Sequence, residues 1–440
     1  MPSFFFDPFR ARKGARAERL AISRRSGARL LGGGGLLLLT IHPGVSQDAL
    51  RYSLAGQAAM EAHRLQPDAM PYTVKSGDFK LLMAPTAALE WNDNVNLVRD
   101  HAQQDFVFRP VLNLSMSYPL TDRNLLLLNL GAGYQQYFQH NELSTWYLAS
   151  GSMLSFDMAV KDVLINFHDQ FSYSRDAALE AAVAETSQFG NIFNDAGVRG
   201  TWDLNDLTLS LGYDHINFAS PAAQFSSQDR ATESLSSQAG LKFSPRITAG
   251  LEATAALTSY DKLVLNDNTS YSAGIYADWR PGSFLRIQPR IGYTITQFQH
   301  TSQSIQTADV NSWYADLTVN HAITDAITYS LSAGHEIRTG IGSDTIEDWY
   351  ARPSVDWNIV QHLTLRTALT CEHGSTGTGN VQGNLMEVYD YAGFDITLGH
   401  EFTSRLYLAL NFRVTIRGSS LPARQYEQNL ASLQLTYTLK

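Results

Sequence analysis

The chain has a single cysteine and no long apolar run, and each absence removes a class of structure. With only Cys371 present, no internal disulfide can form and no cysteine-based metal site can be built. No stretch of eighteen uncharged apolar residues occurs, so membrane-spanning helices, which need about 20 such residues, are excluded. A membrane crossing by this chain would have to be made by β-strands.

Charged residues are also scarce. Their share is 17%, against about 25% in an ordinary soluble domain, while the apolar share is 44% and the mean hydropathy is -0.19. Ser, Thr, Asn, Gln, Gly and Tyr replace the missing charges. This balance is expected where half of each strand faces an apolar medium and half faces water. A length of 440 residues suggests two or three domains, or one large all-β barrel.

Signatures of catalysis are missing as well. The twelve histidines are scattered, with no HExxH, no GxSxG and no pair at the spacing of metal ligands. The "GAG" of residues 131–133 lies within a strand pattern, where glycine bends the sheet or makes room in the lumen rather than cradling a phosphate. We therefore expect no enzymatic activity, no cofactor and no metal site.

Residues 1–46 have the composition of an export signal. Eight basic residues are followed by the apolar "LLGGGGLLLLTI" and the small-residue stretch "HPGVSQ", which predicts a secretory signal cleaved near Ser46. The basic part is long, so a start downstream of Met1, a twin-arginine signal at Arg24 and Arg25, and a disordered basic tail stay open. Without residues 1–29 the chain has 25 basic and 40 acidic side chains, which argues against nucleic acid as a partner.

Residues 47–78 form a lead-in of different character. Helical residues continue to His63, and Pro67 and Pro71 follow. We expect a short periplasmic helix or a disordered segment, because this stretch is too short to be the plug of a TonB-dependent transporter.

From residue 79 onward the chain alternates between apolar and polar or small residues. In "RLYLALNFRVTIR" every even position from Leu406 to Ile416 is apolar, while Arg, Tyr, Ala, Asn and Thr occupy the odd positions. This is the pattern of a two-faced β-strand. Soluble strands usually end after about 5–6 residues, whereas a membrane-crossing strand needs about 9–11. A soluble sandwich or propeller is disfavoured, because burying the polar face without partners costs a few kcal/mol per group.

The connections between these strands alternate in length. Short turns such as "YPLTDRN", "RPGS" and "FTSR" are followed in most cases by longer polar stretches such as "SRDAALEAAVAETSQ" and "GSTGTGNVQGN". Outer-membrane barrels have short periplasmic turns and long external loops. We therefore predict an all-β fold over residues 79–440: a transmembrane, antiparallel, up-and-down β-barrel of about 18 strands, within the range 16–18.

The alternation also assigns side chains to the two faces. Tryptophans near strand ends are predicted to anchor the barrel at the membrane interfaces, where the indole ring meets lipid and its N–H meets water: Trp91, Trp146, Trp202, Trp279, Trp313, Trp349 and Trp357. The candidate pore-lining residues are Arg109, Asn113, Asn166, Asp214, Glu252, Asp278, Arg286, Arg290, Arg366, Asp395, Arg405 and Arg413.

The inward charges and tyrosines each have two interpretations. Both signs of charge are present, so the charges either form rings that select solutes or pair with one another as an internal plug of ion pairs. Inward tyrosines stack on sugar rings in a saccharide pathway, or they pack in a narrow lumen; these are Tyr276, Tyr314, Tyr391 and Tyr407.

The stretch "EWNDNVNL" after the first strand carries a family resemblance. Its oxygens suggest a calcium loop, but Val95, Leu97 and Val98 interrupt the polar run and no helix precedes it, so we interpret it as the base of the first external loop. With the architecture of residues 79–440, it resembles the beta-barrel porin-2 family of outer-membrane proteins, which is often associated with surface polysaccharide production. The chain departs from outer-membrane barrels in ending on Lys440 rather than on an aromatic residue.

The resemblance and the pattern together lead to one functional expectation and two alternatives. We expect a passive channel or export conduit for polysaccharide or small hydrophilic solutes, in the outer membrane of a Gram-negative-type bacterium. Expected partners are outer-membrane lipid and lipopolysaccharide, the barrel assembly machinery and polysaccharide secretion components. The alternatives are a structural or adhesive barrel with a filled lumen, acting through external loops such as residues 176–188, and an outer-membrane hydrolase.

Overall fold

The computed structural model describes residues 70–174, 180–187, 189–302, 307–377 and 386–439. The expected export signal and most of the lead-in lie outside these residues. No helix in the described ranges is long and apolar enough to cross a membrane.

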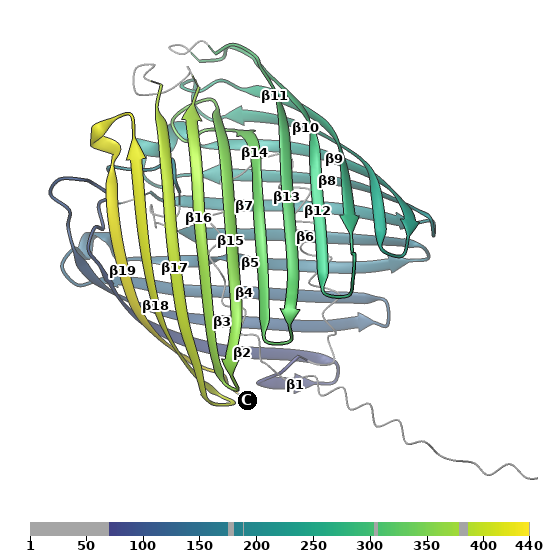
Figure 1. Cartoon of the computed structure of the whole chain (residues 1–440), viewed down its shortest axis with the longest axis horizontal. Coiled ribbons are helices and arrows are strands. Elements are labelled where there is room, and N and C mark those ends of the chain that lie inside the picture. Colours follow the sequence, from purple (N-terminus) through teal and green to yellow (C-terminus); the bar gives the residue numbers. More distant parts are fainter. Residues whose placement is uncertain (1–69, 175–179, 188, 303–306, 378–385, 440) are drawn as a thin grey trace, which may run out of the picture. The chain divides into compact units, whose positions relative to one another are not determined.

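Eighteen long antiparallel strands form the described part of the fold, as the alternation predicts (Figure 1). They are β2 (Phe79–Asn92), β3 (Asp105–Thr121), β4 (Asn124–Tyr137), β5 (Thr145–Val160), β6 (Val163–Ser174), β7 (Asn191–Asp203), β8 (Leu207–Ala219), β9 (Arg230–Ser244), β10 (Ile247–Tyr260), β11 (Asn268–Trp279), β12 (Leu285–Phe298), β13 (Val310–Thr324), β14 (Ile327–Arg338), β15 (Ile346–Val360), β16 (Leu363–Thr376), β17 (Val388–Thr403), β18 (Leu406–Ser419) and β19 (Tyr426–Tyr437). Three short 3-10 helices lie between described strands: η2 (Asn141–Leu143), η4 (Ala223–Gln228) and η5 (Pro422–Arg424).

The sheet closes on itself. Each strand from β2 to β18 pairs with the next one along the chain, and β19 pairs with β2, from Leu430 opposite Asn92 to Thr436 opposite Thr86. The hydroxyl oxygens of Thr86 and Thr436 lie 3.0 Å apart across this seam. Closure leaves no free sheet edge along the paired length, so the backbone polar groups are satisfied within the barrel wall.

A further short strand pairs with the beginning of β2, the strand that closes the barrel with β19. β1 (Val74–Ser76) pairs with the first residues of β2, where Ser76 lies opposite Phe79. Gly77, in the connecting turn, has a φ of 59°, a left-handed conformation that glycine adopts without steric cost. Paired structure thus begins before residue 79, within the stretch expected to be a short helix or disordered.

The connections between strands lie at two rims, with short turns at one rim and longer loops at the other, as the alternation of their lengths predicts. Eight tight connections, such as residues 161–162 and 404–405, form the short-turn rim, where β2 begins and β19 ends. Nine longer ones, such as residues 93–104 and 220–229, form the long-loop rim. Lys161, Asn205 and His362 have positive φ in the short turns, a conformation common in tight hairpin connections.

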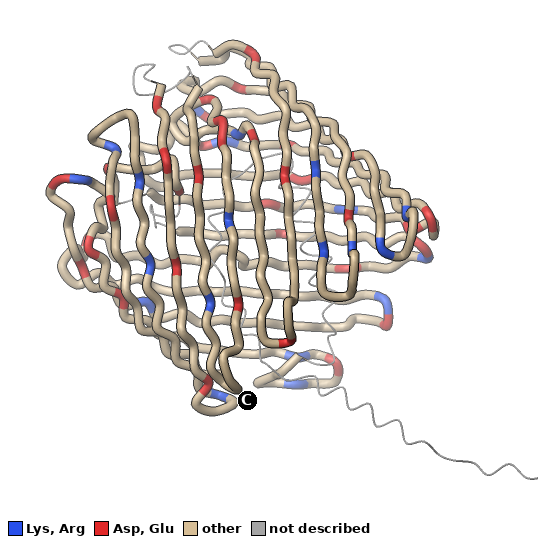
Figure 2. The backbone as a smooth tube through the Cα atoms, in the orientation of Figure 1, with Lys and Arg blue, Asp and Glu red and all other residues tan. Residues whose placement is uncertain are grey.

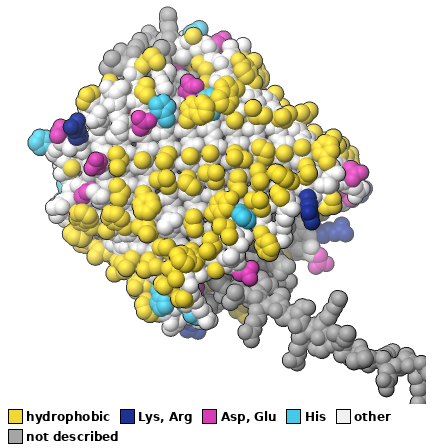
Figure 3. Space-filling model, viewed as in Figure 1, with side chains coloured by type: hydrophobic (Ala, Val, Ile, Leu, Met, Phe, Trp, Pro, Cys, Tyr) yellow, Lys and Arg dark blue, Asp and Glu magenta, His cyan; other side chains and the backbone are white. Residues whose placement is uncertain are grey.

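The two faces of the wall differ in polarity. Along β18, Leu410 and Ile416 are 54% and 47% exposed on the outer face, whereas Thr415 and Arg417 on the inner face are almost fully buried. Apolar side chains form continuous bands across the strands on the face shown in Figure 3, and most charged groups there lie toward the rims. The inner face is therefore polar and the outer face apolar.

Tyrosines on the inner face pack over glycines of neighbouring strands. Tyr314 of β13 lies opposite Gly292 of β12, which lies opposite Gly274 of β11. The phenol reaches over both glycines and donates a hydrogen bond of 3.1 Å to Glu252 of β10. A Cβ added to Gly292 would lie 2.4 Å from Tyr314 Cζ and 2.4 Å from the carbonyl oxygen of Ala273.

The same arrangement recurs elsewhere on the wall and decides between the two interpretations of the tyrosines. Tyr276 and Tyr407 end against Gly240 and Gly399 in this way, and Tyr147 ends against Gly133 of the "GAG" stretch. These contacts support packing over sugar stacking for Tyr276, Tyr314 and Tyr407.

We predict that Gly292→Ala destabilises the barrel by about 1–3 kcal/mol, because the added methyl group overpacks against Tyr314 and the backbone of β11. The matched control is Gly200→Ala, since a Cβ added there meets nothing within 4 Å. The measurement is the urea midpoint of the refolded protein, followed by tryptophan fluorescence. Equal midpoints for the two variants would contradict the packing role of Gly292.

Candidate functional site

The inner face carries the charges that the alternation assigned to it. Arg109, Asp214, Glu252, Asp278, Arg286, Arg290, Arg366, Asp395 and Arg413 all lie on strands at inward positions, together with Asn113 and Asn166. Figure 2 shows both signs of charge interspersed along the strands. Arg405 is the exception. It lies exposed in the tight turn between β17 and β18, because the strand begins one residue later than the alternation indicated.

The inward charges pair with one another, as the second interpretation expects, but they do so within the wall. Three pairs form among the predicted residues: Arg286 Nε with Asp278 Oδ1 at 2.9 Å, Arg290 Nη1 with Glu252 Oε2 at 3.4 Å, and Arg413 Nε with Asp395 Oδ2 at 3.3 Å. The partners belong to adjacent strands or to strands two apart. The pairs therefore line the wall and do not form a plug across the lumen.

Three other predicted charges have partners that the alternation did not single out. Arg109 pairs with Glu90 at 3.0 Å, Asp214 with His168 at 2.9 Å, and Arg366 with Asp356. Strand register decides these partners. Periodicity gives the face of a residue but not the residue opposite it on the next strand.

The predicted tryptophan anchors lie on the outer face at both rims. Trp91, Trp146, Trp313 and Trp349 are near the long-loop rim, and Trp202, Trp279 and Trp357 are near the short-turn rim. Trp313 and Trp349 enclose His335, with ring centroids 4.2 and 4.5 Å from the imidazole. Two aromatic belts separated by an apolar band are the arrangement that a membrane-crossing barrel requires.

The mouth at the long-loop rim is narrowed by the described part of the connection between β6 and β7. We call residues 180–187 the inner segment. Glu180, Thr186 and the four residues between Glu180 and Glu185 are buried, whereas Glu185 is exposed. Ala181 and Ala182 pack with Ile346, Tyr389 and Tyr391 of the facing wall. Val183 and Ala184 pack with Leu97, Phe189 and Tyr426.

Polar contacts fasten the inner segment to β18 and to η5, which follows β18. The Ala181 carbonyl accepts a hydrogen bond of 2.7 Å from Arg417 Nε, and the Ala182 carbonyl accepts one of 2.6 Å from Arg424 Nη2. Both guanidinium groups also contact Glu387, each at 2.8 Å. The buried carboxylate thus holds two arginines in place, and the arginines hold the backbone of the inner segment.

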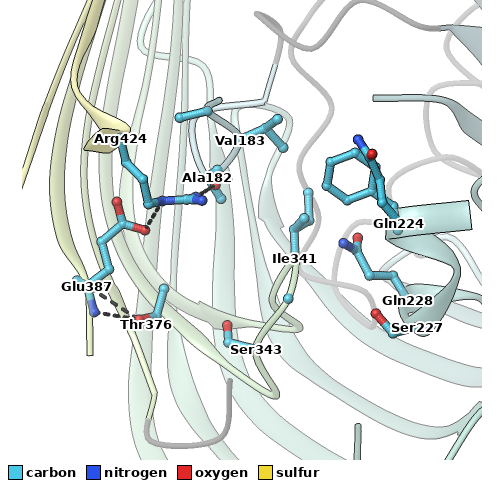
Figure 4. A pocket seen from close by; sticks show the side chains of 13 residues that line it. Ala182, Val183, Gln224, Ser227, Gln228, Ile341, Ser343, Thr376, Glu387 and Arg424 are labelled. Carbon is cyan, nitrogen blue, oxygen red and sulfur yellow. Dashed lines mark hydrogen bonds and ion pairs between the residues drawn. The ribbon is translucent and has the colours of Figure 1, made fainter. Parts of the chain in front are cut away.

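A pocket of about 150 Å³ lies beside the inner segment (Figure 4). Ala182 and Val183 line one side, and Gln224 and Gln228 of η4 line another; Ile341 lies between these sides in the view of Figure 4. Thr376, Glu387 and Arg424 complete the wall near β16 and η5. Apart from the Glu387 and Arg424 ion pair, the labelled lining consists of uncharged side chains.

This placement corrects the example given for one alternative. The adhesive hypothesis named residues 176–188 as one of its external loops, but the described residues 180–187 are folded into the mouth and mostly buried. The hint in the sequence is "AAVA" at residues 181–184, a short apolar run inside an otherwise polar connection. Residues 175–179 and 188 lie outside the described ranges.

The "EWNDNVNL" stretch fastens the first long loop to the barrel seam. Asp93 accepts two hydrogen bonds of 2.7 Å from Asn429 of β19, through its backbone N–H and its Nδ2. Asn94 Nδ2 donates to the carbonyls of Val98 and Glu427. The side-chain oxygens of this stretch serve as turn and seam acceptors, in agreement with its interpretation as a loop base.

Comparison with known proteins finds likeness in fold only. No family model and no curated protein sequence matches the chain. Among solved structures, the outer membrane protein OpdK from Pseudomonas aeruginosa matches with a TM-score of 0.44 and 12% identity, covering 82% of this chain and 99% of that one. OccK2 (OpdF) from the same organism, in complex with glucuronate, gives 0.45 and 10%, covering 82% and 98%. OccAB3 from Acinetobacter baumannii gives 0.43 and 10%, covering 81% and 98%.

We predict that the inner segment is held most firmly at acid pH. Burial raises the pKa of Glu180 above its ordinary 4.5, against the opposing effect of Arg338, whose Nη2 lies 3.5 Å from Glu180 Oε1. A carboxyl group with a raised folded-state pKa contributes its full stabilisation below the unfolded pKa, and this is lost as pH rises through the folded pKa. Amide hydrogen exchange of residues 180–187, corrected for intrinsic pH dependence, should therefore show less protection as pH rises.

Glu180→Gln should remove this dependence, while Glu185→Gln in the same segment should leave it intact because Glu185 is exposed. The same pH dependence in Glu180→Gln and in the native chain would assign the effect to other groups.

Proposed function

We propose that the chain is a channel in the outer membrane of a Gram-negative-type bacterium, through which small hydrophilic solutes diffuse. The polar inner face of a closed barrel with an apolar outer face supports the membrane location and the aqueous path. The observation that carries the proposal is the inner segment, which folds into the mouth and is fastened by Arg417 and Arg424. Such a constriction suits small solutes.

An export conduit for polysaccharide is the second use of the same lumen. The inner segment disfavours it, because residues 181–184 pack against the facing wall and are fastened by Arg417 and Arg424, which reduces the space in the mouth for a polymer.

We further propose that the outer face contacts outer-membrane lipid and lipopolysaccharide, and that the barrel assembly machinery inserts the chain. The exposed Leu433, Leu435 and Tyr437 of β19 support this, because the last strand presents an apolar outward row. Polysaccharide secretion components are proposed as partners only with the export use of the lumen.

We expect discrete conductance steps when the refolded protein is inserted in planar lipid bilayers. Replacing both tethers, Arg417→Ala with Arg424→Ala, should raise the single-channel conductance by roughly two-fold or more, because the narrowest part of a pore dominates its resistance. Arg405→Ala is the matched control, since Arg405 lies exposed at the opposite rim.

A folded barrel that gives no conductance steps, in the native form and in the double variant alike, would overturn the channel proposal. Equal conductance of the native chain and the double variant would show that the inner segment does not limit the conductance, and it would contradict the role given to that segment in the proposal.

A further inference from the structure

Three ionisable side chains meet on the inner face of three consecutive strands: His168 of β6, Asp195 of β7 and Asp214 of β8. One ligand atom from each lies within 4.8 Å of the others, and all three residues are buried. The two charge partners His168 and Asp214 belong to strands that are not neighbours, so a residue of β7 separates them in the register.

That separating residue is Gly197, and the contact depends on it. His168 lies opposite Gly197, and Gly197 lies opposite Asp214. His168 Nε2 and Asp214 Oδ1 approach to 2.9 Å over the glycine. A Cβ added to Gly197 would lie 2.2 Å from Asp214 Oδ1 and 2.7 Å from His168 Nε2. Because Gly197 has no side chain, the imidazole of His168 and the carboxylate of Asp214 occupy the space above it on the inner face.

The hydrogen bonds around His168 fix which ring nitrogen carries its proton. Asn166 Nδ2 donates to Asp157 Oδ1 at 2.6 Å and to Ser155 Oγ at 2.9 Å, so the amide oxygen of Asn166 faces the imidazole. His168 Nδ1 lies 3.1 Å from that oxygen and must donate to it. With Nδ1 donating to Asn166, the 2.9 Å contact between Nε2 and Asp214 Oδ1 needs one proton between these two atoms, and a metal ion bound by both would take the place of that proton. A metal-binding histidine shows this same arrangement, with its other nitrogen donating to an oxygen.

Asp195 supplies the second, independent observation. It lies two residues from Gly197 on the same strand face, its side chain is 1% exposed, and its Oδ1 is buried without a hydrogen-bond partner. A buried carboxylate oxygen without a partner is costly, and cations satisfy such groups. Arg199, two residues beyond Gly197 on the same face, donates its Nη2 to Gln238 at 3.1 Å.

We propose that His168 Nε2 and one carboxylate oxygen each from Asp195 and Asp214 bind a divalent transition-metal ion in the barrel wall. One imidazole nitrogen with two carboxylate oxygens suits Zn²⁺ and its neighbours, whereas Ca²⁺ and Mg²⁺ prefer oxygen ligands alone. Ligand atoms around tetrahedral Zn²⁺ lie roughly 3.4 Å apart for bonds of about 2.0–2.1 Å. The three ligand atoms lie within 4.8 Å of one another, and His168 Nε2 lies 2.9 Å from Asp214 Oδ1, so binding would require small movements of these side chains.

The proposed ion would join β6, β7 and β8 by bonds between side chains. The inner segment leaves the barrel from β6 and β7, so the ion would stiffen the wall at the base of the constriction. The site does not depend on whether the barrel conducts solutes.

The test is metal retention by the full-length protein. Because the site is buried, Zn²⁺ is added during refolding, the protein is passed through a chelator and a desalting column, and retained zinc is measured by mass spectrometry. We expect about one zinc per native chain and a loss of at least about ten-fold in retained zinc for Asp195→Asn. Asp395→Asn on β17 is the matched control, since it removes an inner-face carboxylate from a different pair and should retain zinc as the native chain does.

Folding of each variant is checked by tryptophan fluorescence, and His168→Gln serves if Asp195→Asn does not refold. Zinc retained equally by the native chain and by Asp195→Asn or His168→Gln would assign it to adventitious sites elsewhere and overturn the proposal. No retained zinc in the native chain would overturn it as well.

Discussion

Closure of the sheet between β19 and β2 is the constraint on which the rest of the structure depends. Once Leu430 to Thr436 pair with Asn92 to Thr86, each strand from β2 to β19 is paired on both sides. Alternate side chains then face the inside and the outside of the barrel. The outer row of leucines, the inner row of polar groups and the two aromatic belts all follow from that division. A slip of one residue at the seam would reverse the faces of the terminal strands.

Inside the barrel, small and large residues complement one another across the register. Glycine partners let Tyr314 lie along the wall until it reaches Glu252, and Gly197 lets His168 meet Asp214. Paired charges occupy the same surface without crossing the lumen. The space of the lumen is instead reduced by the inner segment, which is the described part of one long connection and is held by arginines of the opposite wall.

Much of the fold could be predicted from the local sequence pattern, because the alternation along one strand shows which of its residues share a face. Alternation placed the even-numbered residues from Leu406 to Ile416 outside and Arg413 inside. Pro, Asp, Asn or Ser marked seven of the eight short turns, and the turn at residues 361–362 is Gln-His. Arg405 was misplaced by one residue at a strand boundary. Partners such as Glu90 and His168 depend on the register between strands, which periodicity does not contain. The inner segment was missed because its composition resembles an external loop, although "AAVA" marks its buried part.

The most direct test of the account is the chemical environment of two adjacent residues in the membrane. In a Cys371→Ser background, Leu410→Cys and Asn411→Cys place one thiol on each face of β18. With the protein in lipid vesicles, a small membrane-impermeant thiol reagent should label Asn411→Cys from the lumen and leave Leu410→Cys unreacted. Labelling of Leu410→Cys with protection of Asn411→Cys, or equal labelling of both, would contradict a water-lined barrel that spans a membrane.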